Sequence, residues 1–141
     1  PLERGHYAHY SPPEKYQAFR WNFPWRKYTA VGVPDGLTKQ FVYEYKTTSN
    51  RFLFSFLKPV AFAQADLYGH FFNRPKKRVQ IRILDENKIE TFESLADVAR
   101  AEETLNAFAR VEGGRPAHPP RPWKCRKCEF KVTCPISQAK E

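Results

Sequence analysis

Two carboxylates and a lysine in the first third of the chain have the types and spacing of a metal-dependent hydrolytic site. Asp35 follows a β-prone segment, and Glu44 and Lys46 lie in the next one. Side chains two residues apart on a strand share a face, so Glu44 and Lys46 point the same way. Two carboxylates on neighbouring strands can bind one Mg²⁺ or Mn²⁺ for phosphodiester hydrolysis, with the lysine stabilising developing charge. The alternative is an ordinary solvated pair on a surface strand.

A glutamine and a tyrosine in the following helical segment extend this pattern. Gln64 and Tyr68 are four residues apart, so a helix places them on one face. They can contact a substrate phosphate or hold Lys46, or they can belong to a half-buried amphipathic face. His9, four residues after Gly5, is a candidate imidazole ligand that would complete the metal shell.

The chain has three cysteines, all near its C-terminus: Cys125, Cys128 and Cys134. An odd number of cysteines so close together argues against a disulfide framework and favours a metal or cluster site. Three thiolates are one short of the four ligands that zinc and iron–sulfur sites usually need. His118 is an alternative fourth ligand for zinc, although it lies among prolines without the usual spacing.

The charge balance points to a polyanionic partner. The chain has 24 Lys plus Arg against 15 Asp plus Glu, which gives a net charge of +9. This excess favours nucleic acid over an acidic or neutral ligand. The expected phosphate contacts follow the long helix and surround the cysteines, at Arg74, Lys76, Lys77, Arg78, Lys124 and Lys127. A solvated charged surface is the alternative.

Aromatic side chains are concentrated before the first carboxylate, at Tyr16, Phe19, Trp21, Phe23 and Trp25. Their ring faces can stack on single-stranded bases. An aromatic core is the competing use.

Periodicity and turn residues predict the order loop, two strands, helix, two strands, helix and cysteine tail. Residues 10–28 mix prolines and aromatics without a sustained period, which predicts loops or at most a short helix. Two hairpins are expected, one pairing 28–33 with 40–48 and the other pairing 79–84 with 88–92.

Helix boundaries are predicted from proline, serine and glycine. Pro59 is expected in the first turn of the long helix, where proline is tolerated. Ser94 is expected to cap a second helix that runs to Val111 and ends at Gly113 and Gly114.

Taken together, five motifs resemble, in order, those of the RecB-like branch of the PD-(D/E)XK nucleases. Within that branch, the iron–sulfur type used as the CRISPR-associated adaptation nuclease is the most similar. The resemblance implies an α/β fold, with a central mixed sheet flanked by helices and a C-terminal cysteine-cluster tail. The motifs are Gly5-x-x-x-His9, Gly32-Val33-Pro34-Asp35, Glu44-Tyr45-Lys46, Gln64-x-x-x-Tyr68 and Cys125-x-x-Cys128-x5-Cys134-Pro135.

The resemblance also assigns roles to individual residues. Lys46 becomes the catalytic lysine, and Gln64 with Tyr68 forms the helix motif of the branch. The implied ligands of the Mg²⁺ or Mn²⁺ ion are His9, Asp35, Glu44 and the backbone carbonyl of Tyr45.

Nucleases of this iron–sulfur type hold a [4Fe-4S] cluster with one cysteine before the histidine motif and three in the tail. This sequence has the three tail cysteines and no upstream one. We therefore expect the fourth cysteine to precede Pro1, with a nuclease core over residues 1–112 that lacks its start. Residues 113–141 are expected to form a Pro-rich linker and the iron–sulfur-binding tail.

The expected function is a Mg²⁺- or Mn²⁺-dependent deoxyribonuclease, with exonuclease action on single-stranded DNA or overhangs. In the CRISPR-associated case it processes spacer precursors beside the integrase complex. One alternative is a RecB-like exonuclease of DNA repair or of a helicase, and another is a catalytically silent DNA-binding scaffold. No stretch reaches the roughly 18 to 20 apolar residues of a membrane span, so we expect no membrane partner and a cytoplasmic location. The resemblance implies that the cell is prokaryotic or that the chain belongs to a virus of one.

Overall fold

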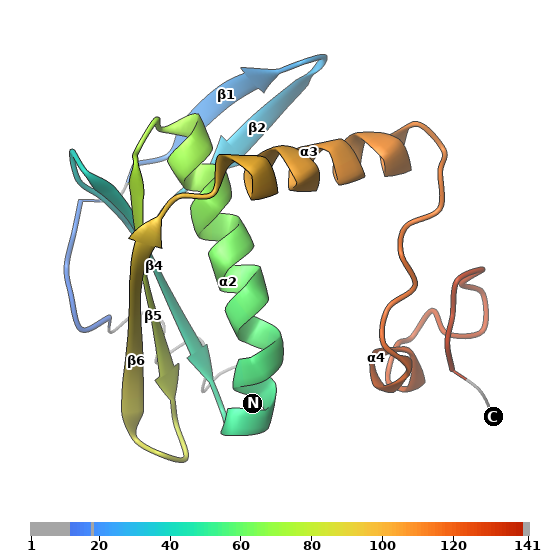
Figure 1. The fold of residues 1–141 in the computed structure, drawn as a ribbon. Helices are drawn as coiled ribbons and strands as arrows, with labels where there is room; N and C mark the ends of the chain where they lie inside the picture. The colour runs from blue at the N-terminus through green and yellow to red at the C-terminus, as the bar shows by residue number, and fades with distance from the viewer. Residues whose placement is uncertain (1–11, 18, 140–141) are drawn as a thin grey trace. The chain divides into compact units, whose positions relative to one another are not determined.

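The computed structural model describes residues 12–17 and 19–139 and contains a mixed four-stranded sheet in the order β3–β4–β5–β6. Strands β3 (Gly36–Leu37) and β4 (Phe41–Thr48) are antiparallel, and β4 is parallel to β5 (Lys76–Ile83). Strand β6 (Lys88–Leu95) is antiparallel to β5. Helix α2 (Arg51–Phe71) joins the two parallel strands and crosses one face of the sheet (Figure 1). The expectation of an α/β fold with a mixed sheet and helices is confirmed at this level.

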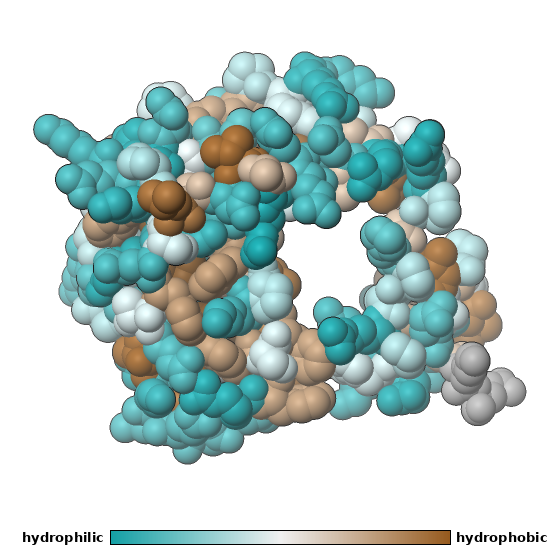
Figure 2. Space-filling view, in the orientation of Figure 1, coloured by the Kyte–Doolittle hydropathy of each residue, from teal (hydrophilic) through white to brown (hydrophobic). Residues whose placement is uncertain are grey.

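Helix α2 is held to the sheet by apolar side chains from both elements. The core contains Val42 of β4, three residues of β5 and three of α2, namely Val79, Ile81, Ile83, Phe54, Ala61 and Ala65. The β5 residues alternate along the strand and therefore face one side, and the α2 residues follow a helical repeat. On the outer side of α2, Phe52 and Val60 are 64% and 55% exposed, and Figure 2 shows apolar surface over this helix.

Residues 21–32 form a separate hairpin of β1 (Trp21–Trp25) and β2 (Tyr28–Gly32). The prediction of loops for residues 10–28 is therefore wrong for β1, and the predicted pairing of 28–33 with 40–48 is wrong too. Arg26 has a φ of 52°, in the left-handed region used by tight hairpin turns. Pro24 concealed the strand from sequence reasoning, but both strands of a two-stranded sheet are edges, where proline is tolerated.

The long helix begins eight residues before the predicted proline. Asn50 caps it, since its side chain accepts a hydrogen bond from the Leu53 backbone N–H at 2.9 Å. Pro59 lies inside the helix, where it removes one backbone hydrogen bond at a cost of about 3 kcal/mol. Burial of Phe54 in the core stabilises the extra helical turns upstream of Pro59 and offsets this cost.

The second hairpin is confirmed, because β5 and β6 pair in the predicted order. Ser94 is not a helix cap, however, because it belongs to β6. The cap of α3 (Val98–Glu112) is Asp97, whose carboxylate accepts from the Arg100 backbone N–H at 3.0 Å. The predicted glycine end is confirmed by Gly114, which has a φ of 91°.

The chain divides into two compact units between Glu102 and Glu103, inside α3, whereas the sequence placed the boundary after residue 112. The second unit contains the short helix α4 (Pro122–Arg126) and the three cysteines. In the part of the chain that the structure describes, no helix is both long and apolar enough to cross a membrane.

Candidate active site

Strand β4 carries the predicted glutamate and lysine on one face, the face that α2 covers. Glu44 alternates with the core residue Val42 and is only 1% exposed. Lys46 is partly exposed, and its Nζ forms an ion pair with Oε1 of Glu44. The predicted sharing of a face is confirmed, and the alternative of a solvated surface pair does not describe a carboxylate buried this deeply.

Asp35 is fastened to β4 by a hydrogen bond. Strand β3 is only two residues long and pairs with β4 as far as Tyr43. Beyond that point the Asp35 Oδ2 accepts the backbone N–H of Tyr45 at 2.8 Å, so a side chain continues the contact with β4. The bond places Asp35 beside the peptide that follows Glu44.

The environment of Glu44 favours its protonated form. Burial raises the pKa of Glu44 to about 7, with a further rise caused by Asp35, while Lys46 acts in the opposite direction. Its Oε2 is buried and has no hydrogen-bond partner among the described residues. A buried polar atom without a partner is rare and requires an explanation, such as an ion.

A divalent cation fits this donor set. The Asp35 and Glu44 carboxylates and the Tyr45 carbonyl are the oxygen ligands that Mg²⁺ and Mn²⁺ prefer. Within residues 12–17 and 19–139, no three His, Cys, Asp or Glu side chains gather in a way that could hold a metal ion. The third side chain that the sequence predicts is His9, which lies outside the described residues.

Gln64 and Tyr68 lie on one face of α2 as predicted, and the tyrosine reaches the segment that leads to Asp35. The Gln64 Nε2 donates to the Tyr68 hydroxyl at 3.3 Å. That hydroxyl donates to the Val33 carbonyl, also at 3.3 Å. A Cβ at Gly32 would lie 2.6 Å from Cε1 of the Tyr68 ring, so a larger residue there would force the ring to shift. These contacts fix the approach of residues 32–35 to the site.

The structure separates the predicted phosphate contacts into residues that are engaged within the protein and lysines that are exposed. Lys77 is 5% exposed and paired with the buried Asp66, so it has no access to a nucleic acid backbone and is removed from the set. Arg74 donates to the carbonyls of Thr38 and Phe72, and Arg78 is paired with Glu14 and Glu93. Lys76, Lys124 and Lys127 are exposed and remain candidate phosphate contacts.

Asp66 is an organising residue that sequence reasoning missed. It is 0% exposed, and its Oδ1 accepts from the Lys77 ammonium and from the Asp97 backbone N–H. Asp66 thus joins α2, β5 and the start of α3 at one carboxylate. The sequence signal that could have predicted its burial was its position, because Asp66 directly follows Ala65 among the buried positions of α2.

The three cysteines are free and differ in exposure. Cys125 is buried and its Sγ accepts from the Gln138 backbone N–H at 3.2 Å, whereas Cys128 is exposed. Among the residues described, the three thiols do not form a group placed to share a metal. This arrangement does not fit a [4Fe-4S] cluster as it stands, so the cluster stays a prediction.

Comparison with known proteins supports the fold. The chain matches no protein-family profile, and no curated protein matches it in sequence. Its structure is similar to that of SSO0001, known from a crystal structure, with a TM-score of 0.60 and 20% sequence identity. The similarity covers 88% of this chain and 60% of SSO0001, so the chain spans less than two thirds of that protein. At this identity the likeness shows only an α/β fold with a mixed four-stranded sheet packed against helices.

Proposed function

We propose that this protein is a metal-dependent deoxyribonuclease of the RecB-like PD-(D/E)XK type, acting on single-stranded DNA or overhangs. The observation that carries the proposal is Glu44, a buried carboxylate with an unpartnered oxygen, paired with Lys46 and lying beside Asp35. Burying such a charge costs several kcal/mol, which a purely structural ion pair seldom repays. Groups with such perturbed titration gather at functional sites.

Each residue of the site has a distinct role in the proposal. Asp35 and Glu44 hold the divalent cation, which supplies activation of water and neutralisation of the phosphate charge when it is bound. Lys46 lies on the same face as Glu44 and offers an ammonium to the charge that develops on the phosphate. Tyr68 and Gln64 keep the segment before Asp35 in place.

The biological context rests on the resemblance of the five motifs. It favours processing of spacer precursors in CRISPR adaptation, with the integrase complex as partner and a [4Fe-4S] cluster at Cys125, Cys128 and Cys134. The alternatives are an exonuclease of repair or of a helicase, which has the same site, and a silent scaffold. The intact set of Asp35, Glu44 and Lys46 argues against the scaffold.

The test is cleavage of end-labelled single-stranded and duplex oligonucleotides with Mn²⁺, with Mg²⁺ and with chelator. We expect cleavage only with metal, and a loss of about 10²-fold or more in Lys46→Ala and in Glu44→Gln. Lys88→Ala is the matched control, because Lys88 is an exposed lysine beside Glu90 on β6. Full activity of Lys46→Ala, or cleavage that resists chelation, would contradict the proposed site. DNA binding without cleavage under every metal condition would favour the scaffold.

A further inference from the structure

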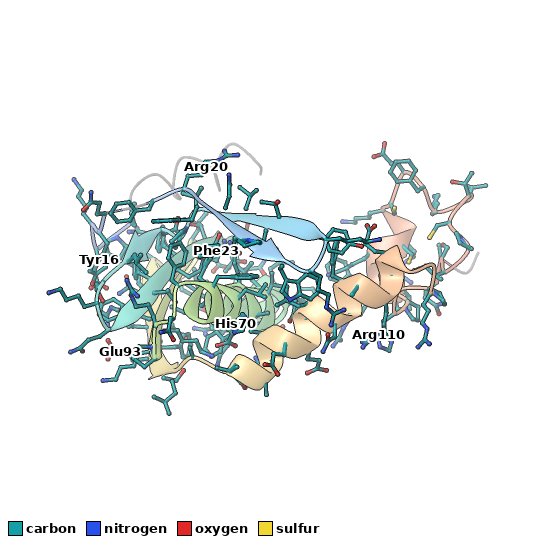
Figure 3. All side chains as sticks on the ribbon, turned by 90° about the horizontal axis from the view of Figure 1, so that it is seen from above. Tyr16, Arg20, Phe23, His70, Glu93 and Arg110 are labelled. Atoms are coloured by element: carbon teal, nitrogen blue, oxygen red, sulfur yellow. The ribbon has the colours of Figure 1, made fainter. Side chains whose placement is uncertain are left out.

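The hairpin aromatics fall into packed and exposed groups. Phe23 stacks on Phe71 at 5.2 Å between ring centroids and meets Phe72 edge-on at 4.9 Å, so it fastens the hairpin to the C-terminal end of α2. In Figure 3, Phe23 lies on the side of the hairpin nearer to α2. Trp21 differs, because 51% of it remains exposed. A large ring exposed to this degree is available to a ligand.

Trp21 lies next to the helix motif of the candidate site. It pairs across the hairpin with Gly32, the residue that packs against the Tyr68 ring. Trp21 and Tyr68 also contact the same ring, since each has its centroid 6.4 Å from that of Phe72. From Gly32 the chain runs three residues to Asp35. The exposed indole therefore lies at the border of the site.

Positive charge accompanies the exposed ring. Arg20 directly precedes Trp21 and is exposed. The turn of the hairpin carries exposed Arg26 and Lys27 and begins after Trp25, which lies about 13 Å along the strand from Trp21. Each of these two cations lies over an aromatic ring of the hairpin, Arg26 over Trp25 at 4.7 Å and Lys27 over Tyr28 at 5.4 Å. Rings with flanking cations match the bases and phosphates of a single strand.

We propose that Trp21 stacks on a base of single-stranded DNA next to the scissile phosphodiester, and that the hairpin guides the strand to the site with Arg20, Arg26 and Lys27. This inference rests on the proposed function and adds the residues that select a single strand. Bases inside a duplex are already stacked on one another, whereas those of a single strand offer their faces to an indole. The hairpin would thus discriminate by strandedness and tolerate any sequence.

The direct test follows the fluorescence of Trp21. Trp25→Phe and Trp123→Phe leave Trp21 as the single tryptophan of the chain. Oligothymidylate is titrated in the presence of chelator, so that binding is measured without cleavage. We expect base stacking to quench the Trp21 emission with the single strand, and little quenching with a duplex of equal length.

Affinity measurements on variants complete the test. Trp21→Ala should weaken oligothymidylate binding about 5- to 100-fold, while Trp21→Phe should restore most of the affinity. Phe52→Ala is the matched control, because it removes a similarly exposed ring from the opposite end of α2. The inference would be overturned by unquenched emission, by equal quenching with the duplex, or by wild-type affinity of Trp21→Ala. If the wild type still cleaves DNA in that case, the proposed function stands without the inference. Absence of both binding and cleavage in the wild type would overturn the two together.

Discussion

The unit that ends at Glu102 and the unit that begins at Glu103 differ in how they are held together. In the first, the central strands are buried by α2, and Val79, Ile81 and Ile83 are 0% exposed. In the described part of the second, Cys125 is the only buried residue. Its apolar side chains instead face solvent, with Phe130 62% and Val132 87% exposed.

This difference teaches where each candidate site gets its precision. The carboxylates and the lysine are attached to strands whose positions the core determines, which is how functional side chains are held in a productive geometry. The cysteines lie on a segment with almost no buried area, so apolar packing cannot bring the three thiols together. A metal cluster that crosslinks them would supply the missing stabilisation, since metal binding and folding are coupled in such segments.

The largest effect is expected from the cluster. The test is purification of the protein without oxygen, followed by iron analysis and absorption spectroscopy. We expect about four irons per chain and absorption near 400 nm, both lost in Cys128→Ser, together with faster trypsin cleavage after Lys124 and Lys127. A colourless protein with one zinc, or an iron content unchanged by Cys128→Ser, would contradict the proposed cluster. The cluster would then not explain how the second unit is held together.

Asp66→Ala should produce the largest loss of stability in the first unit. The change leaves the Lys77 ammonium buried without its partner, which typically costs about 3 to 5 kcal/mol. Thermal and urea unfolding measure the loss. Replacing the pair by Asp66→Leu with Lys77→Met should recover part of it, because the uncompensated charge is gone while the Asp97 backbone N–H still lacks its acceptor.

Glu86→Ala is the control for this prediction, since Glu86 pairs with Arg51 on the surface and should matter little. Equal effects of Asp66→Ala and Glu86→Ala would show that the buried ion pair does not organise the first unit.

The buried Glu44 predicts how stability depends on pH. Its pKa is about 7 in the folded protein against 4.5 as the ordinary value, so the folded state binds this proton more tightly. The stabilisation that this proton gives to the folded state is fully present below about pH 4.5 and is lost as the pH rises through about 7. The loss amounts to about 3 kcal/mol of the free energy of unfolding. Urea unfolding of the metal-free protein between pH 4.5 and 8 measures this loss.

Glu44→Gln separates this effect from that of the other titrating groups, because it replaces the titrating carboxyl group by an amide and keeps the shape of the side chain. Mn²⁺ should restore stability at pH 8 in the wild type but not in Glu44→Gln, since a ligand of the folded state stabilises it. A wild-type pH profile identical to that of Glu44→Gln would show that the pKa of Glu44 is not raised.

The smallest effect concerns salt and compares exposed lysines of the two units. Each phosphate contact contributes about 0.7 to the slope of log affinity against log salt for single strands. Lys124→Ala combined with Lys127→Ala should therefore lower the slope by about 1.4, while Lys88→Ala leaves it unchanged. An unaltered slope would mean that the tail does not contact DNA, and a flat slope in the wild type would exclude nucleic acid as the principal ligand.

Prediction from sequence succeeded where the signal is local. The shared face of Glu44 and Lys46 follows from the two-residue period of a strand, and the shared face of Gln64 and Tyr68 from the helical repeat. The second hairpin also followed from its polar turn. Prediction failed where a distant partner decides, as for β1, which is a strand because it pairs with β2 and packs on α2. It failed again at Pro59, where burial of Phe54 outweighed a local preference.

The sequence by itself determined the type and spacing of the reactive groups, the excess of positive charge and the order of the elements from β4 onward. Tertiary structure alone decided that Glu44 is buried with an unpartnered oxygen and that Asp35 is held to the Tyr45 backbone. It also buried Lys77 and left Trp21 exposed against the ring of Phe72, which Tyr68 contacts too. The physical reason is that burial and pKa depend on which segments pack together in space, and a residue's neighbours along the chain carry little of that information.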